Sequence, residues 1–187
     1  FIKAVKFICA SHIKPAILPP FMQSVQEIYP LLGNKKNIII TMHQKPDGDA
    51  MGASLGLFHF LKGIGHDVTV VSPTNWANFL SWMPGCESVI DFEARREVCE
   101  QKISNCDIIF CLDFNVLHRT RQMEHPLANA NCIKVLIDHH QQPQREMFTY
   151  GVSDTMKSST CEMVYEFIEN SPYTSVLNKD IATCLYT

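Results

Sequence analysis

Short apolar runs alternate along the chain with amphipathic segments. The runs are apolar at consecutive positions and rich in β-branched residues, which is typical of strands buried on both faces of a parallel sheet. The predicted strands are residues 37–42, 67–72, 107–112 and 133–137, with a weak strand at 88–91 and an edge strand at 148–152. The predicted helices are residues 23–32, 50–64, 93–102 and 160–170, with a helical or irregular segment at 119–129 and a last helix from about residue 176. This alternation predicts an α/β fold with a mainly parallel sheet.

The composition is that of a globular protein. The 187 residues are 46% hydrophobic and 19% charged, which provides for a core and excludes a disordered, collagen-like or coiled-coil chain. The net charge of −3 shows no basic bias of a nucleic-acid binder. A phosphate substrate stays open, because bound metal ions can supply positive charge.

The eight cysteines include no CxxC pair, which argues against a zinc knuckle and favours reduced, buried thiols. No stretch approaches the roughly 20 apolar residues of a membrane span, so no membrane partner is expected. A cytoplasmic protein is predicted from these two observations together.

The two ends of the sequence carry separate expectations. Met22 is an expected natural start, which sets residues 1–21 apart as an extension, either upstream readthrough or a flexible arm. These residues do not fit a signal peptide, because His12 and Lys14 interrupt the apolar run. The apolar run 181–187 is followed by no turn or polar tail, so the domain over 22–187 is expected to be incomplete at its C-terminus.

Acidic and histidine side chains follow three of the predicted strands. They are His43, Asp47 and Asp49 after the first strand, Asp113 after residues 107–112, and Asp138, His139 and His140 after residues 133–137. Ligand sites of open parallel sheets form outside the carboxyl ends of the strands, so these side chains are expected to converge. Crowded carboxylates repel one another unless a cation lies between them, and Asp with His but without Cys suits Mn²⁺ or a similar ion. The set exceeds the needs of one ion and predicts a two-metal centre for phosphoryl chemistry.

Each of these residues alone has a plainer interpretation. Asp113 by itself is most simply a turn or helix-capping residue, Asp138 a loop acid, and a His-His pair a surface or core feature. Their joint occurrence at three strand ends favours the metal interpretation. The other histidines are interpreted as structural or solvated residues.

Three motifs resemble those of the DHH phosphoesterases. Residues 43–52, HQKPDGDAMG, are similar to the HxxPDGDAxG opening motif, residues 113–115 to the second motif, and residues 138–140 are the Asp-His-His signature. Residues 62–68 and the Ser-Ser-Thr of residues 158–160 also match. The resemblance covers about residues 37–187 and is strongest to the oligoribonuclease and pAp-phosphatase (nanoRNase-like) branch. It implies the three-layer α/β fold of a DHH-type N-terminal domain.

The resemblance also implies roles for individual residues. His43 and Asp47 are expected to bind one Mn²⁺, Asp49 and His139 the other, and Asp113 to bridge the two ions. Mg²⁺ or Co²⁺ are alternatives to Mn²⁺.

Three further residues have implied roles near the metals. His140 is expected to face the phosphate, and Asp138 to hold the histidine pair in orientation. Arg119 is expected either to contact substrate or to serve only the structure.

The implied activity is Mn²⁺-dependent hydrolysis through a water activated by two metals. The expected substrates are short RNA or DNA oligonucleotides, cleaved to 5′-nucleotides, and 3′-phosphoadenosine 5′-phosphate, cleaved to AMP. Inorganic pyrophosphatase and cyclic-dinucleotide phosphodiesterase are the alternative enzymes, and an inactive metal-binding fragment is the alternative from another class. The family's fourth motif and its C-terminal substrate-binding domain do not occur in these residues, so the substrate choice and a homodimeric assembly stay open.

Overall fold

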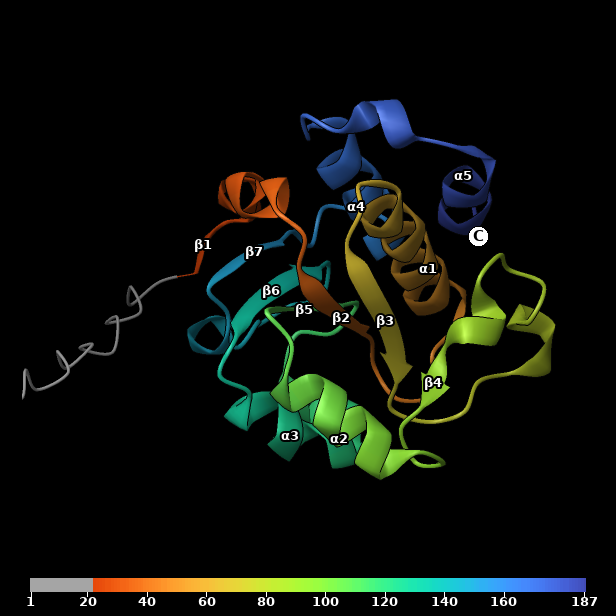
Figure 1. The fold of residues 1–187 in the computed structure, drawn as a ribbon, viewed down its shortest axis with the longest axis vertical. Helices are drawn as coiled ribbons and strands as arrows, with labels where there is room; N and C mark the ends of the chain where they lie inside the picture. The colour runs from red at the N-terminus through yellow and green to blue at the C-terminus, as the bar shows by residue number, and fades with distance from the viewer. Residues whose placement is uncertain (1–21) are drawn as a thin grey trace, which may run out of the picture.

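A seven-stranded sheet, parallel at every pairing, forms the centre of the molecule in the computed structural model, which describes residues 22–187 (Figure 1). The predicted extension over residues 1–21 lies outside the described residues. The strand order is β1-β7-β6-β5-β2-β3-β4. The strands are β1 (Gln23–Ser24), β2 (Asn37–Thr41), β3 (Asp67–Ser72), β4 (Ile90–Asp91), β5 (Ile108–Leu112), β6 (Ile133–Asp138) and β7 (Tyr150–Ser153). The predicted α/β fold with a mainly parallel sheet is confirmed.

Helices cover both faces of this sheet. The α-helices are α1 (Gly48–Gly63), α2 (Arg96–Ser104), α3 (Glu124–Asn129), α4 (Thr160–Glu169) and α5 (Lys179–Leu185). The 3₁₀ helices are η1 (Val25–Gly33), η2 (Asn78–Leu80), η3 (Cys86–Ser88), η4 (Leu117–Met123), η5 (Arg145–Met147) and η6 (Thr174–Val176). Helices α1, α4 and α5 lie on one face, and α2 and α3 on the other (Figure 1). The expected three layers are therefore present.

The central strands are buried on both faces. Ile38 and Ile40 of β2 pack in the core beneath α1 and α4, whereas Ile39 packs in the second core beneath α2 and α3. Complete burial of one such side chain is worth roughly 1.5–3 kcal/mol. Burial on both faces explains why the strand reads as a continuous apolar run.

The predicted edge strand is not at an edge. Strand β7 pairs with β6 on one side, where Tyr150 lies opposite Val135, and with β1 on the other, where Tyr150 lies opposite Gln23. Strand β1 consists of two polar residues, too few to produce a periodic signal. The described edges of the sheet are β1 and β4.

Two helical predictions differ from the structure in detail. The segment predicted as a helix from residue 23 is the 3₁₀ helix η1, which contains Pro30. The last helix begins at Lys179 rather than near residue 176, because the side chain of Asn178 accepts a hydrogen bond from the N–H of Ile181 at 3.0 Å and caps it there.

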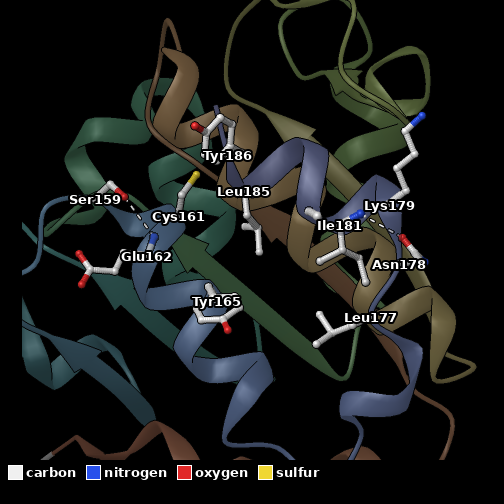
Figure 2. A pocket seen from close by; sticks show the side chains of 11 residues that line it. Ser159, Cys161, Glu162, Tyr165, Leu177, Asn178, Lys179, Ile181, Leu185 and Tyr186 are labelled. Atoms are coloured by element: carbon white, nitrogen blue, oxygen red, sulfur yellow. Dashed lines mark hydrogen bonds between the residues drawn. The ribbon is translucent and has the colours of Figure 1, made fainter.

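Helix α5 packs against α1 and α4 and leaves an apolar groove beside α4 (Figure 2). Leu177, Ile181 and Leu185 line one side of the groove, and Cys161 and Tyr165 of α4 line the other. Within residues 22–187, no helix combines the length and the apolarity that a membrane crossing requires.

Candidate metal centre

The loop from β2 to α1 supplies the first three candidate ligands. His43 lies just beyond the end of β2, and Asp47 and Asp49 lie at the start of α1. Asp47 is the N-cap of α1, where its Oδ1 accepts the N–H of Ala50 at 3.1 Å. Lys45 adopts a left-handed conformation (φ 48°) within this turn. The turn therefore places the three side chains beside the carboxyl end of β2.

Asp113 lies immediately after β5 and is only 2% exposed. Its backbone is left-handed (φ 62°), a region that Asp tolerates better than most residues. Its N–H still donates to the carbonyl of Ile137 at 3.2 Å. Arg119 donates from Nη1 to the Asp113 carbonyl at 3.4 Å, so the backbone of Asp113 is held on two sides.

The end of β6 supplies the acid and the two histidines of the signature. Asp138 is fully buried, and its Oδ1 accepts a hydrogen bond from Nδ1 of His140 at 2.8 Å. Burial raises the pKa of Asp138, and the hydrogen bond and charge of His140 offset part of this shift. Asp138 Oδ2 has no hydrogen-bond partner among the described residues. The rings of His139 and His140 contact edge to face, with centroids 4.8 Å apart.

The ring nitrogens and carboxylates of these turns converge on Asp113. Its Oδ2 lies 3.4 Å from Nε2 of His43, and its Oδ1 lies 3.4 Å from Nε2 of His139. Nε2 of His139 is also 3.7 Å from Oδ2 of Asp49, and Nε2 of His43 is 3.9 Å from Oδ1 of Asp47. These separations exceed ordinary hydrogen-bond lengths. They match the spacing of about 3–4 Å expected for atoms that share one ion at roughly 2.0–2.2 Å.

The opposite nitrogen of each of these two rings is anchored on the backbone. Nδ1 of His43 contacts the carbonyl of Gln44 at 2.8 Å, and Nδ1 of His139 contacts the carbonyl of Lys157 at 3.3 Å. A carbonyl oxygen can only accept, so each Nδ1 is the donor in its contact, and Nε2 is the nitrogen that faces the carboxylates. This is the usual arrangement of metal-ligating histidines. The donor set therefore fits divalent ions.

The electrostatics of the cluster keep Asp113 ionised. Burial alone would raise its pKa, but contacts with His43 and Thr160 and the charges of His43 and His140 outweigh burial, and the pKa is lowered. Burial alone would lower the pKa of His43, but its contacts with Asp113 and with the carbonyl of Gln44 outweigh this, and the pKa is raised. An ionised carboxylate is the form that a metal requires.

All the predicted site residues lie at this edge of the sheet, although they do not occupy equivalent places. Of the five expected metal ligands, His43 and Asp47 form one close group with Asp113, and His139 forms a second with Asp113 and His140. Asp49 joins the second group through Nε2 of His139, at 3.7 Å. His140 approaches Asp113 only through Nδ1, at 3.8 Å, and that nitrogen is already bonded to Asp138. Arg119 contacts the backbone of Asp113.

The contacts made by the start of α4 are not predicted from the sequence. Thr160 donates from Oγ1 to Asp113 Oδ1 at 2.9 Å, and the N–H groups of Thr160 and Cys161 each donate to Asp49 at 2.8 Å. The Ser-Ser-Thr sequence predicts a helix start there, but these contacts join residues 47 to 112 positions apart. Spacing along the chain therefore carries no signal of them.

The chain is similar to proteins of known sequence and structure. The bifunctional oligoribonuclease and PAP phosphatase NrnA of Mycoplasma genitalium is 25% identical over 165 residues, which are 87% of this chain and 48% of that protein. The crystal structure of an exopolyphosphatase-related protein from Bacteroides fragilis matches with a TM-score of 0.83 and 36% identity, over 87% of this chain and 48% of that one. The chain thus spans about half the length of these relatives. Residues 37–187 match the DHH family, N-terminal domain, and the chain belongs to the DHH family, as its three motifs predict.

Proposed function

We propose that this protein is a divalent-metal phosphoesterase whose centre holds two Mn²⁺ ions, with Mg²⁺ or Co²⁺ as alternatives. The residues proposed to hold the ions are His43, Asp47, Asp49, Asp113 and His139. One observation carries the proposal. The two oxygens of a buried Asp113 each face the free Nε2 of a different histidine, and each of those rings is anchored through Nδ1 on a backbone carbonyl. Asp113 is therefore suited to bridge two ions.

The charge of the cluster is matched to a phosphate ester. Asp47, Asp49 and Asp113 contribute three negative charges, whereas two divalent ions carry four positive charges, so the loaded centre attracts a phosphate. When bound, such ions supply Lewis acidity toward phosphorus and toward the attacking water. The chain thus needs few Lys or Arg residues for phosphate, in accord with its net charge of −3.

Two residues are proposed to act on the substrate beside the metals. His140 keeps Nε2 available because Asp138 accepts its Nδ1–H, and we assign it to the phosphate as a donor that stabilises developing charge. Asp138 is the positioning residue of this pair. Arg119 is held beside Asp113 by one nitrogen, and the other N–H groups of its guanidinium are assigned to the substrate.

The proposed substrates are short oligonucleotides and 3′-phosphoadenosine 5′-phosphate. The printed name of the Mycoplasma genitalium relative, an oligoribonuclease and PAP phosphatase, supports this choice. Pyrophosphate, linear polyphosphate and cyclic dinucleotides are the competing substrates, because the metal cluster alone fits any phosphoric ester or anhydride.

A comparison of these substrates tests the proposal. The complete natural protein is assayed with Mn²⁺ on a diribonucleotide, 3′-phosphoadenosine 5′-phosphate, pyrophosphate, polyphosphate and a cyclic dinucleotide. Asp113→Asn is expected to lower hydrolysis of the preferred substrate by about 100-fold or more. The matched control is Asp67→Asn, a change at an exposed aspartate where β3 begins, which is expected to leave the rate unchanged. Hydrolysis independent of divalent ions, or a fully active Asp113→Asn, would overturn the assignment. A preference for pyrophosphate would change the proposed substrate class from nucleotide phosphoesters to inorganic pyrophosphate.

A further inference from the structure

The first turn of α4 touches two of the proposed metal ligands at once. The Thr160 N–H donates to Asp49 Oδ2 and the Cys161 N–H to Asp49 Oδ1, both at 2.8 Å. The Thr160 hydroxyl donates to Asp113 Oδ1 at 2.9 Å. Thr160 is thus a single residue that connects a carboxylate of α1 with the carboxylate at the end of β5.

The two N–H groups that donate to Asp49 are among those that have no hydrogen-bond partner within helix α4. The N-cap Ser159 accepts the N–H of Glu162 at 3.1 Å, and the Glu162 carboxylate accepts from the N–H and hydroxyl of Ser158 (Figure 2 shows the Ser159 bond). The first N–H groups of a helix have no partner within the helix. An ionised carboxylate that pairs with them also gains from the positive end of the helix dipole. Each oxygen of Asp49 keeps a second lone pair for a metal.

The hydroxyl of Thr160 determines how the Asp113 carboxylate is turned. Thr160 is fully buried, and a β-branched side chain at the start of a helix has few rotamers. Its bond goes to Oδ1, the oxygen that faces His139, and Oδ2 is left to face His43. A rotation of this carboxylate would break the bond to Thr160 and would turn both oxygens away from their imidazoles.

We propose that Thr160 is a positioning residue that fixes the carboxylates of Asp49 and Asp113 relative to each other, at the separation that two bridged ions require. This inference rests on the proposed metal-dependent function. The Thr160 hydroxyl is not needed to cap helix α4, because the N-cap is Ser159, and the proposal gives this hydroxyl a role of its own.

Three variants separate positioning from helix stability. Thr160→Val removes the hydroxyl and keeps the shape of the side chain. Thr160→Ser restores a donor at the same place. Ser159→Ala removes the N-cap bond of the same helix without removing a contact to Asp49 or Asp113, and is expected to lower stability by about 1 kcal/mol.

The experiment measures Mn²⁺ affinity by titration calorimetry and the melting temperature of the metal-free protein. Thr160→Val is expected to weaken Mn²⁺ binding by about 10–100-fold, whereas Thr160→Ser and Ser159→Ala stay within about threefold of the wild type. Thr160→Ala replaces Thr160→Val if the latter does not fold, as judged by circular dichroism.

Two results would overturn the inference alone. One is wild-type Mn²⁺ affinity in the variant that lacks the Thr160 hydroxyl. The other is an equal loss of affinity in Ser159→Ala, which would make the effect one of helix stability. A wild-type protein that binds neither Mn²⁺, Mg²⁺ nor Co²⁺ would instead overturn the proposed function, and this inference with it.

Discussion

Helices α1 and α5 approach closely at two glycines, and this contact predicts different costs for two similar substitutions. A Cβ at Gly52 would lie 2.5 Å from the backbone carbonyl oxygen of Cys184 and 3.0 Å from Cys161 Sγ. A Cβ at Gly56 would lie 2.5 Å from Cδ2 and 2.7 Å from Cγ of Leu185, a flexible and partly exposed side chain that can move as a whole about its Cα–Cβ bond. Relief of the clash at Gly52 therefore requires a shift of the α5 backbone, whereas relief of the clash at Gly56 requires only a rotamer change of Leu185.

The magnitudes follow from two opposing terms. Replacement of glycine by alanine inside a helix gains up to about 1 kcal/mol from helix propensity. Overpacking costs roughly 1–3 kcal/mol, near the upper end where backbone must move. Gly52→Ala is thus expected to lower the free energy of unfolding by about 1–2 kcal/mol, and Gly56→Ala to change it by less than about 0.5 kcal/mol.

Urea unfolding of the metal-free protein, followed by circular dichroism, measures both values. A Gly52→Ala variant as stable as the wild type, or a Gly56→Ala variant that loses as much stability as Gly52→Ala, would contradict this prediction. Either result would mean that α5 does not pack on α1 in this register.

Three further predictions concern buried polar groups and the site. Burial raises the pKa of Tyr29 to about 12 while its hydroxyl donates to the Phe167 carbonyl, so stability is fully present below the unfolded pKa of about 10 and is lost toward pH 12. The expected loss in the free energy of unfolding between pH 10 and pH 12 is about 2–3 kcal/mol, and urea unfolding of Tyr29→Phe over this pH range should not show it. An equal alkaline loss in the variant would contradict the prediction. Asp138→Asn is expected to lower kcat by about 10–100-fold while Mn²⁺ affinity in calorimetry stays within about threefold, and an equal loss of affinity would make Asp138 part of the metal site instead. Arg119→Gln is expected to raise KM about tenfold with little change in kcat, and a lowered melting temperature with unchanged KM would assign it to structure.

The strands that carry the site could be predicted because burial leaves a mark in the sequence. Strand β2 is buried on both faces, so Ile38, Ile39 and Ile40 form an unbroken apolar run with a polar turn after it. The carboxyl-edge rule for parallel sheets then places His43 and Asp113 together without knowledge of any contact. These two steps were sufficient for the main features of the fold and the candidate ligands.

The features that could not be predicted depend on contacts between distant parts of the chain. Strand β1 exists only because two polar residues, Gln23 and Ser24, pair with β7, more than 120 residues later. The role of Thr160 depends on a turn of helix that meets α1 and β5 in space. The left-handed backbone of Asp113 is likewise set by its surroundings, since Asp is common in both turns and helix caps.

Electron paramagnetic resonance of the Mn²⁺-loaded protein tests directly whether Asp113 bridges two ions. A carboxylate bridge holds two ions about 3.5–4 Å apart, close enough for magnetic coupling. We expect a coupled two-Mn²⁺ signal in the wild type that is lost in Asp113→Asn and kept in Asp67→Asn. Only the hyperfine pattern of isolated Mn²⁺ in the wild type, or a coupled signal that survives Asp113→Asn, would contradict it.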